Sequence, residues 1–245
     1  MTVVSERVQY EPSGIRRIPH QIPADLRLWW IDLDAYAASD PLAGLEASDY
    51  EQAERMAFEL DARRLLAGRH VVRSLVAGTV DRSARELMIV ADGFGKPRLL
   101  DSTVRFSLSR SDRYGLVGVS GELEVGVDVE LIRPVPEAEA LARDHFTDVE
   151  QVEWQRAGPE GRDRRFLECW TRKEACAKAL GTGLLIQPAL IEVGGAADVR
   201  VANIRPGETP CEVTVCSLNP SVEAVAAAAV ATKEAAEVAR RASSP

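Results

Sequence analysis

The chain has 245 residues, of which 46% are hydrophobic and 28% charged, and its formal net charge is −8. This composition is that of a soluble globular protein with a substantial core, and the negative charge disfavours wholesale binding to nucleic acid or anionic lipid. No apolar run approaches the roughly twenty residues of a membrane span, and the N-terminus lacks the pattern of a signal peptide, so we expect a cytoplasmic protein.

The first half of the chain predicts an irregular lead-in over residues 1–25, a long helical segment and several strands. Apolar residues at three- and four-residue steps place the helical segment over 47–77, with Gly78 as its end. Its second half carries four arginines that face either a bound phosphate or solvent: Arg63, Arg64, Arg69 and Arg73. Strand-like runs cover 26–33, 86–90, 104–109 and 114–120, and a turn covers 92–97.

The second half predicts helices over 137–143 and 148–156, a polar loop over 158–165 and a strong helix from Phe166 to a glycine stop at Gly181. Further strands are predicted over 190–193, 199–204, 212–218 and 222–230, followed by a short helix over 232–241. Because the strands cluster and do not alternate with helices, we predict an α+β fold. The halves 1–120 and 121–245 are loosely alike, which indicates a pseudo-dimer of two small, mostly antiparallel sheets packed with helices.

Residues 123–131, LEVGVDVEL, carry a clear strand pattern. Apolar residues alternate with polar ones, so the side chains of Asp128 and Glu130 point to the same side, about 7 Å apart. Two carboxylates at this spacing repel each other, and Mg²⁺, a basic partner or solvent must offset that repulsion. An exposed strand with an acidic outer face is the simpler alternative.

The helix that begins at Phe166 carries Glu174 and Lys178 four residues apart, on the same side of neighbouring turns. As a surface ion pair they would stabilise the helix by only about 0.2–0.5 kcal/mol. If this face instead lies beside Asp128 and Glu130, Glu174 becomes the third carboxylate of an open Mg²⁺ site, and Lys178 reaches a phosphate bound there.

Neither the cysteines nor the histidines point to another chemistry. The four cysteines form no CxxC pair and have no histidine at zinc-ligand spacing, so zinc is not expected. Cys169 and Cys176 lie two turns apart on one helical stripe, where a free thiol acts as a small apolar side chain. The three histidines have no companion serine or cysteine motif, so a nucleophilic triad has no support.

Two motifs together resemble the paired signature of the 4′-phosphopantetheinyl transferases, G-[IV]-D-[IV]-E followed by W-x-x-K-E-x-x-x-K. They are GVDVE, from Gly126 to Glu130, and WTRKEACAKALGTGL, from Trp170 to Leu184. The resemblance extends to GKP at 95–97, FSLSRS at 106–111 and, more weakly, DARRLLAGRHVVRS at 61–74. Each motif alone is weak, but four in the right order are a strong signal. The length and two-half layout are similar to the surfactin-synthetase-activating (Sfp) type, which is a pseudo-dimer in one chain.

The resemblance implies Mg²⁺-dependent transfer of the phosphopantetheine arm of coenzyme A to a serine of an acyl or peptidyl carrier protein, with release of adenosine 3′,5′-bisphosphate. By this analogy, Asp128, Glu130 and Glu174 hold Mg²⁺ against the pyrophosphate, and Glu174 also accepts the serine proton. Lys178 stabilises the transferring phosphate or protonates the leaving one. The positions that match coenzyme A contacts are Arg64, Lys96, Ser109 and Arg110. Such an enzyme serves fatty acid, polyketide or nonribosomal peptide assembly, and we expect a monomer.

One residue departs from the family pattern, because a histidine usually stands where this chain has Arg110. Arginine is also a strong phosphate ligand, so a binding role survives the change, whereas a proton-transfer role does not. Two alternatives stay open: an inactive paralogue that retains coenzyme A, and a Mg²⁺-dependent phosphohydrolase that uses the same carboxylates. The intact carboxylates and Lys178 argue against the first, and the lack of a nucleophile motif or phosphate-binding glycine loop argues against the second.

Overall fold

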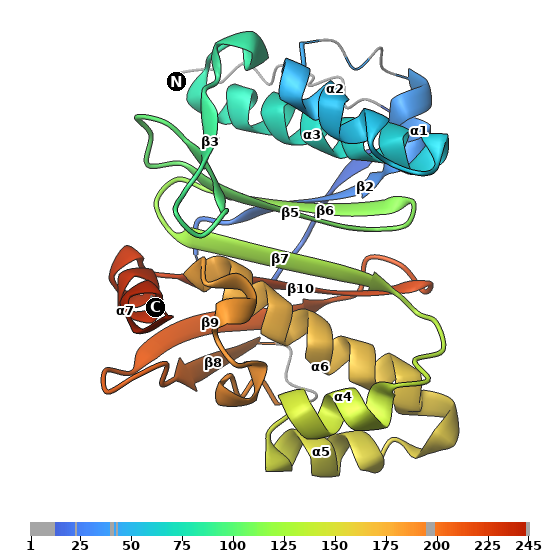
Figure 1. The fold of residues 1–245 in the computed structure, drawn as a ribbon, viewed down its shortest axis with the longest axis vertical. Helices are drawn as coiled ribbons and strands as arrows, with labels where there is room; N and C mark the ends of the chain where they lie inside the picture. Colours follow the sequence, from blue (N-terminus) through green and yellow to red (C-terminus); the bar gives the residue numbers. More distant parts are fainter. Residues whose placement is uncertain (1–12, 23, 40–41, 43, 195–198, 244–245) are drawn as a thin grey trace, which may run out of the picture.

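Two four-stranded antiparallel sheets lie face to face in the middle of the molecule, and helices cover the outer face of each (Figure 1). The structure, a computed structural model, describes residues 13–22, 24–39, 42, 44–194 and 199–243. Most of the predicted lead-in, residues 1–12 and 23, lies outside the described residues. The mixed, mainly antiparallel architecture confirms the predicted α+β class. The division into two halves at residue 120 stays a proposal.

The first sheet has the strand order β1-β2-β6-β5. Its strands are β1 (Ile15–Ile18), β2 (Arg27–Asp32), β5 (Arg105–Ser111) and β6 (Tyr114–Ser120). Its helices are α1 (Leu33–Ser39), α2 (Ala47–Glu54) and α3 (Glu59–Val80), with a 3₁₀ turn, η1 (Ala84–Glu86). A separate hairpin pairs β3 (Ile89–Ala91) with β4 (Pro97–Leu99). Apolar residues of α3 pack on the outer face of this sheet, and they form one of three core clusters.

The second sheet has the strand order β7-β10-β9-β8. Its strands are β7 (Glu124–Leu131), β8 (Val199–Ile204), β9 (Cys211–Leu218) and β10 (Ala224–Ala231). Its helices are α4 (Ala138–His145), α5 (Asp148–Gln155), α6 (Gly158–Leu180) and α7 (Lys233–Ser243), with 3₁₀ turns η2 (Gly183–Leu185) and η3 (Pro188–Leu190). The long helix α6 packs on the outer face of this sheet and forms the second core cluster. Within the described ranges, no helix has the length and apolar character needed to cross a membrane.

The strand β7 is buried on both sides, because it lies at the junction of the two sheets. Val125, Val127 and Val129 fill the third core cluster between the sheets, together with residues of β2 and β6. The opposite side of β7, which carries Gly126 and Asp128, is covered by α6. The alternative of an exposed strand with an acidic outer face is therefore wrong.

Four predicted segments need correction. The helical segment over 47–77 is two helices, and the second passes through Gly78 and ends at Val80, followed by Asp81 with a left-handed φ of 52° as its C-cap. The predicted loop over 158–165 is the start of α6, because Pro159 fits the first turn of a helix, where no intrahelical donor is needed. Residues 15–18 of the lead-in form β1, and 190–193 is a 3₁₀ end with a single β-bridge at Ile191.

The alanine-rich segment of β10 is a strand despite its helical propensity. Every residue from Ala224 to Ala231 is buried, and the strand is paired on both edges, with β7 and with β9. Small side chains suit this position, since one side of the strand faces α6 and the other faces the first sheet. Tertiary packing therefore overrides propensity here.

Candidate active site

A glycine on β7 brings α6 against the strand. A Cβ atom at Gly126 would lie 2.0 Å from the carbonyl oxygen of Ala175 and 2.3 Å from the backbone nitrogen of Ala179. Any side chain at this position would therefore force the helix away from the sheet. Because Glu174 and Lys178 flank these two backbone atoms, the same close approach delivers both side chains to the polar side of β7.

Asp128 is the centre of the resulting cluster. Its Oδ1 atom accepts hydrogen bonds from Lys178 Nζ at 2.6 Å and from the hydroxyl of Ser109 at 2.8 Å, and Lys178 Nζ also lies 3.2 Å from Ser109 Oγ. The Asp128 side chain is 6% exposed and that of Lys178 is 31% exposed, so the ion pair lies at the mouth of the site. Asp128 Oδ2 is buried and has no hydrogen-bond partner in the described part of the chain.

Two further carboxylates, those of Glu130 and Glu174, lie close enough to Asp128 for its charge to change their pKa. Burial and the charge of Asp128 both raise the pKa of Glu130, and burial followed by Asp128 raises the pKa of Glu174. The hydroxyl of Ser111 donates to Glu130 Oε2 at 3.1 Å. The predicted neighbours Asp128, Glu130, Glu174 and Lys178 are thus brought together. Among the described residues, however, no three acidic, histidine or cysteine side chains form a ready-made metal site.

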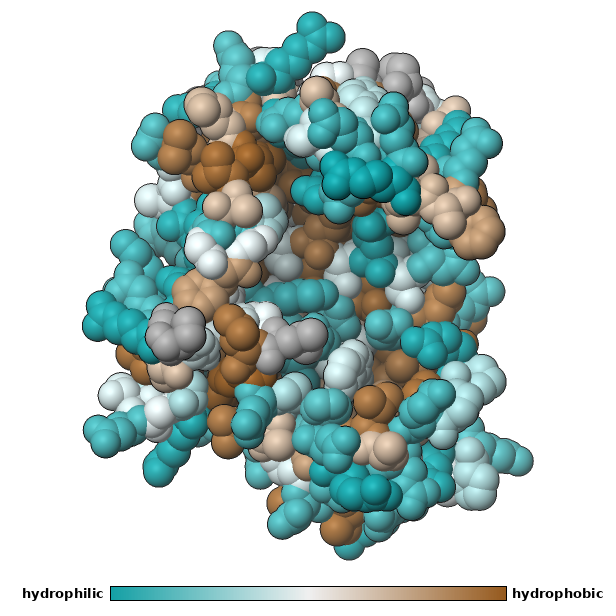
Figure 2. All heavy atoms as spheres, viewed as in Figure 1, coloured by the Kyte–Doolittle hydropathy of each residue, from teal (hydrophilic) through white to brown (hydrophobic). Residues whose placement is uncertain are grey.

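A cavity of about 670 Å³ opens beside this cluster, between α3, the β3–β4 hairpin, β5 and the end of α6. The face of the molecule in Figure 2 is hollowed between the upper helices and the region of α6. The lining includes three of the predicted coenzyme A contacts, Lys96, Ser109 and Arg110, together with Arg69 and Lys178. The cavity is therefore both large and rich in cationic groups, and its polar end is the Asp128 cluster.

Among the described residues, Arg110 is the cation of this cavity that forms no ion pair, although the charge of Asp61 acts on it. In the described residues its guanidinium makes no hydrogen bond or ion pair, and its aliphatic part packs against α3 at Gly68, where a Cβ atom would lie 2.8 Å from Arg110 Cδ. Burial and the nearby charge of Arg69 lower the pKa of Arg110. A desolvated arginine beside a second arginine favours an anionic ligand.

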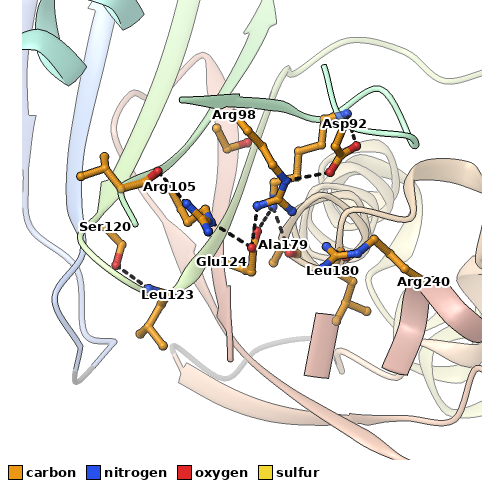
Figure 3. Close-up of polar contacts among 12 residues, drawn as sticks. Asp92, Arg98, Arg105, Ser120, Leu123, Glu124, Ala179, Leu180 and Arg240 are labelled. Atoms are coloured by element: carbon orange, nitrogen blue, oxygen red, sulfur yellow. Dashed lines mark hydrogen bonds and ion pairs between the residues drawn. The ribbon is translucent and has the colours of Figure 1, made fainter. Parts of the chain in front are cut away.

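Lys96 lines the cavity, but its ammonium group is held by the protein itself. Lys96 Nζ donates to Glu124 Oε2 at 2.9 Å and to the carbonyl oxygen of Ala179 at 3.0 Å. Arg98 and Arg105 contact the same carboxylate beside the end of α6 (Figure 3). Arg98 Nη1 donates to Glu124 Oε1 at 2.7 Å, and Arg105 Nε donates to the same oxygen at 3.1 Å. The sequence interpretation missed this cluster, although Glu124 lies on the same side of β7 as Asp128.

The charges of this cluster shift the pKa of Glu124 and the pKa of Lys96 to different extents. Burial alone would raise the pKa of Glu124, but Lys96 and Arg98 outweigh it and lower that pKa to about 2. Burial lowers the pKa of Lys96 to about 8 in spite of Glu124, because the lysine has one carboxylate partner whereas the carboxylate has three cations. The lowered pKa of Glu124 keeps this carboxylate ionised at pH 7.

Arg64 is the one predicted coenzyme A contact that does not line the cavity. Its guanidinium forms a two-point ion pair with Asp34, at 2.7 Å and 2.8 Å, and a further ion pair with Asp112. The hydrogen bond to Asp34 is the main reason that the pKa of Arg64 is raised. From the same arginine-rich helix, Arg69 reaches the cavity instead. The prediction for Arg64 therefore has no support from this geometry.

The structure agrees with the prediction that the cysteines act as small apolar side chains. Cys169, Cys176, Cys211 and Cys216 are buried and form no disulfide in the described structure, and burial raises the pKa of the first three thiols. A thiol with a raised pKa is a poor nucleophile at neutral pH.

Comparison with known proteins decides the family. The family model of the 4′-phosphopantetheinyl transferase superfamily matches residues 124–231, from β7 to β10. The 4′-phosphopantetheinyl transferase HetI of Nostoc sp. is 31% identical over 166 residues, which cover 65% of this chain and 70% of that protein. The chain belongs to the 4′-phosphopantetheinyl transferase superfamily.

Other members of the superfamily give the same picture. A putative 4′-phosphopantetheinyl transferase of Synechocystis sp., slr0495, is 32% identical over 161 residues, or 64% of this chain and 65% of that one. The 4′-phosphopantetheinyl transferase psf-1 of Bacillus pumilus is 29% identical over 176 residues, or 70% and 73% of the two chains. The family resemblance drawn from the two motifs is thereby confirmed, and the region matched by the family model holds Asp128, Glu130, Glu174 and Lys178.

Proposed function

We propose that the chain transfers the 4′-phosphopantetheine group of coenzyme A to a serine of an acyl or peptidyl carrier protein. The observation that carries this proposal is the Asp128–Lys178–Ser109 cluster, with Glu130 and Glu174 beside it, at the polar end of a cationic cavity. The serine oxygen forms a bond to the phosphorus that carries pantetheine, and the bond from that phosphorus to the rest of the pyrophosphate breaks. Adenosine 3′,5′-bisphosphate leaves.

The chemistry of the donor set fits Mg²⁺, which prefers oxygen ligands. Asp128 Oδ2 is buried without a hydrogen-bond partner among the described residues, and the mutual repulsion of three carboxylates is relieved by a cation. Asp128, Glu130 and Glu174 would hold the ion. A bound Mg²⁺ neutralises charge on the pyrophosphate oxygens and so stabilises the leaving group.

The protein's own side chains supply the rest of the reaction. Glu174 accepts the proton of the attacking serine, since its carboxylate lies beside Asp128 at the polar end of the cavity. Lys178 Nζ has three donors, of which Asp128 and Ser109 take two, so one is left for the transferring phosphate. The positive charge of Lys178 also balances the charge that develops on the leaving oxygen.

The cavity supplies the binding energy for coenzyme A. Arg110 and Arg69 offer guanidinium donors to its phosphates, and in the described part of the chain no carboxylate forms an ion pair with Arg110, although the charge of Asp61 acts on it. Lys96 keeps a third donor besides those directed at Glu124 and Ala179, so it can contact a phosphate without leaving its place.

The test is incubation of the full chain with Mg²⁺, coenzyme A and an apo carrier protein, followed by intact-mass measurement of the carrier. We expect the carrier to gain the mass of one phosphopantetheine, and a carrier whose acceptor serine is replaced by alanine to gain nothing. Coenzyme A binding without any gain would identify an inactive paralogue. Release of inorganic phosphate without a carrier would identify a phosphohydrolase.

A further inference from the structure

Three serines of β5 join the two sheets at the edge of the candidate active site. β5 and β7 lie side by side but belong to different sheets, so no backbone ladder joins them. Ser107, Ser109 and Ser111 occupy alternate positions and therefore point to one side of β5, toward β7. Their hydroxyls bond to Val127 N at 3.2 Å, Asp128 Oδ1 at 2.8 Å and Leu131 N at 3.1 Å, respectively.

Ser111 makes one contact that Ser107 does not. Both hydroxyls accept a hydrogen bond from a backbone N–H of β7, but Ser111 Oγ also lies 3.1 Å from Glu130 Oε2. A hydroxyl has a single proton. Because the N–H of Leu131 supplies the proton of its own bond, the proton of Ser111 is directed to the Glu130 carboxylate. The polarity of this small network is therefore determined.

We infer that Ser111 is a positioning residue for Glu130, and that it holds this carboxylate in the orientation in which Glu130 and Asp128 together bind a divalent cation. This inference rests on the proposed function. The bond occupies Oε2 of Glu130 and restricts the rotation of this long, part-buried side chain. A carboxylate that is oriented before the cation arrives loses less conformational freedom on binding.

The size of the effect follows from the behaviour of hydrogen bonds to metal-binding carboxylates. Loss of such an outer partner typically weakens metal affinity about 10- to 100-fold. Ser111 acts on one of three carboxylates, and Asp128 keeps its own hydroxyl partner, Ser109. We therefore expect Ser111→Ala to weaken divalent-cation binding by about tenfold, near the lower end of that range.

The experiment compares three variants of the full chain: Ser111→Ala, Ser111→Thr and Ser107→Ala. Mn²⁺ is the probe, and free Mn²⁺ is measured by electron paramagnetic resonance with and without coenzyme A, in the absence of carrier protein. Ser107→Ala is the matched control, since it removes a hydroxyl bond to a β7 backbone N–H without touching a carboxylate. Ser111→Thr keeps the hydroxyl. Thermal unfolding of all three variants checks that they fold.

We expect Ser107→Ala to bind Mn²⁺ within about twofold of the parent protein, Ser111→Ala to bind about tenfold more weakly, and Ser111→Thr to restore binding. In a Glu130→Gln background, Ser111→Ala should have no further effect. Equal Mn²⁺ affinity of Ser111→Ala and the parent, equal loss in Ser107→Ala, or no Mn²⁺ binding by the parent would each overturn the inference.

The carrier-protein assay separates this inference from the proposed function. If the parent protein transfers phosphopantetheine and Ser111→Ala needs no more Mg²⁺ than the parent, the positioning role fails and the transferase stands. If the parent binds Mn²⁺ with the predicted order of variants but modifies no carrier, the transferase fails and the role of Ser111 stands.

Discussion

Glu124 and Asp128 lie on the same side of the same strand, and both are paired with a lysine, yet their surroundings are opposite. Glu124 is 1% exposed and is contacted by three cations, Lys96, Arg98 and Arg105. Asp128 forms an ion pair with one cation, Lys178, and its neighbours Glu130 and Glu174 are both carboxylates, with Arg133 as a further cation that acts on Glu130. The first cluster has an excess of positive charge inside the protein, and the second has an excess of negative charge.

Both clusters contain an ion pair, so it is the ratio of charges that distinguishes the Glu124 cluster from the Asp128 cluster, which we propose to be the reactive one. The Glu124 carboxylate has both oxygens occupied, and Lys96 also ties the β3–β4 hairpin to the last turn of α6 through the carbonyl oxygen of Ala179. Asp128 keeps one oxygen without a partner in the described residues. Substitutions in the Glu124 cluster should therefore lower the stability of the protein, and substitutions in the Asp128 cluster should lower its activity.

The largest effect is expected for Glu174→Gln. Loss of the base and of one carboxylate of the cluster should lower the transfer rate by about 10³-fold. The free energy of unfolding should stay the same or increase, because the variant removes repulsion from Asp128 and Glu130 and breaks no ion pair in the described structure. The carrier mass assay and urea unfolding measure the two quantities.

Glu160→Gln is the control for this prediction, because Glu160 is exposed in the first turn of the same helix. It should leave the rate unchanged and lower the unfolding free energy by at most about 0.3–1 kcal/mol, because it removes a negative charge from the first turn of a helix. Turnover of Glu174→Gln at the rate of the parent protein would contradict the assigned role and place the base elsewhere.

The second largest effect is expected for Glu124→Gln, which should lower the free energy of unfolding. The substitution leaves Lys96, Arg98 and Arg105 without their shared counter-charge, and breaking a buried ion pair from one side costs about 3–5 kcal/mol. Urea unfolding at pH 7 measures the loss. Glu122→Gln, at an exposed neighbouring position, should change stability by less than about 0.5 kcal/mol.

The parent protein and Glu124→Gln can also be compared as a function of pH. Because the pKa of Glu124 is lowered from 4.5 to about 2, the unfolded chain binds its proton more readily than the folded chain. The stabilisation by this group is therefore full above pH 4.5 and is lost as the pH falls toward 2. The difference in unfolding free energy between the parent and Glu124→Gln should shrink over that range. A difference that is constant with pH would contradict the ionised state of Glu124.

Gly126→Ala should affect both clusters, because α6 carries residues of each. A methyl group 2.0 Å from the carbonyl oxygen of Ala175 must displace the helix, and overpacking of this kind costs about 1–3 kcal/mol. The transfer rate should fall as well, since Glu174 and Lys178 move with the helix. Thermal unfolding and the carrier assay report the two losses.

Gly78→Ala is the matched control for the glycine substitution. A Cβ atom at Gly78 meets nothing within 4 Å, and the residue lies inside α3, so alanine should stabilise the protein by about 0.5–1 kcal/mol. If Gly126→Ala behaves like Gly78→Ala, the close approach of α6 to β7 is not required.

Local periodicity was sufficient to predict most of the fold and the local placement of the acidic residues, whereas their assignment to one site came from the family resemblance. Asp128 and Glu130 follow from strand alternation, and Glu174 and Lys178 follow from the four-residue helical step. These patterns depend only on neighbours in the chain. The boundary errors arose where local residues allow two structures, as in the glycine- and proline-containing first turn of α6, which reads equally as a loop.

The remaining site residues depend on contacts between distant elements. Arg64 and Arg69 are five residues apart, so their side chains differ by about 140° around α3. Sequence alone does not tell which of them meets a cavity and which meets Asp34. The roles of Glu124 and Ser111 likewise appear only when β4 or β5 is placed beside β7.

Arg110 extends the comparison from carboxylates to cations, and its substitution should have the smallest effect. Arg98 and Arg105 have carboxylate partners, whereas the guanidinium of Arg110 faces the cavity without one in the described structure. Arg110→Ala should therefore raise the KM for coenzyme A by about tenfold, the loss of one charged hydrogen-bonding group, and leave kcat and stability nearly unchanged. Arg110→Lys, which keeps the charge but not the planar fork of donors, should show an intermediate KM. Steady-state kinetics with varied coenzyme A separates the two constants. A fall in kcat at saturating coenzyme A, with KM unchanged, would contradict this binding role. It would show that Arg110 contacts the transition state and not the bound substrate, because kcat falls in this way only when an interaction made solely in the transition state is lost.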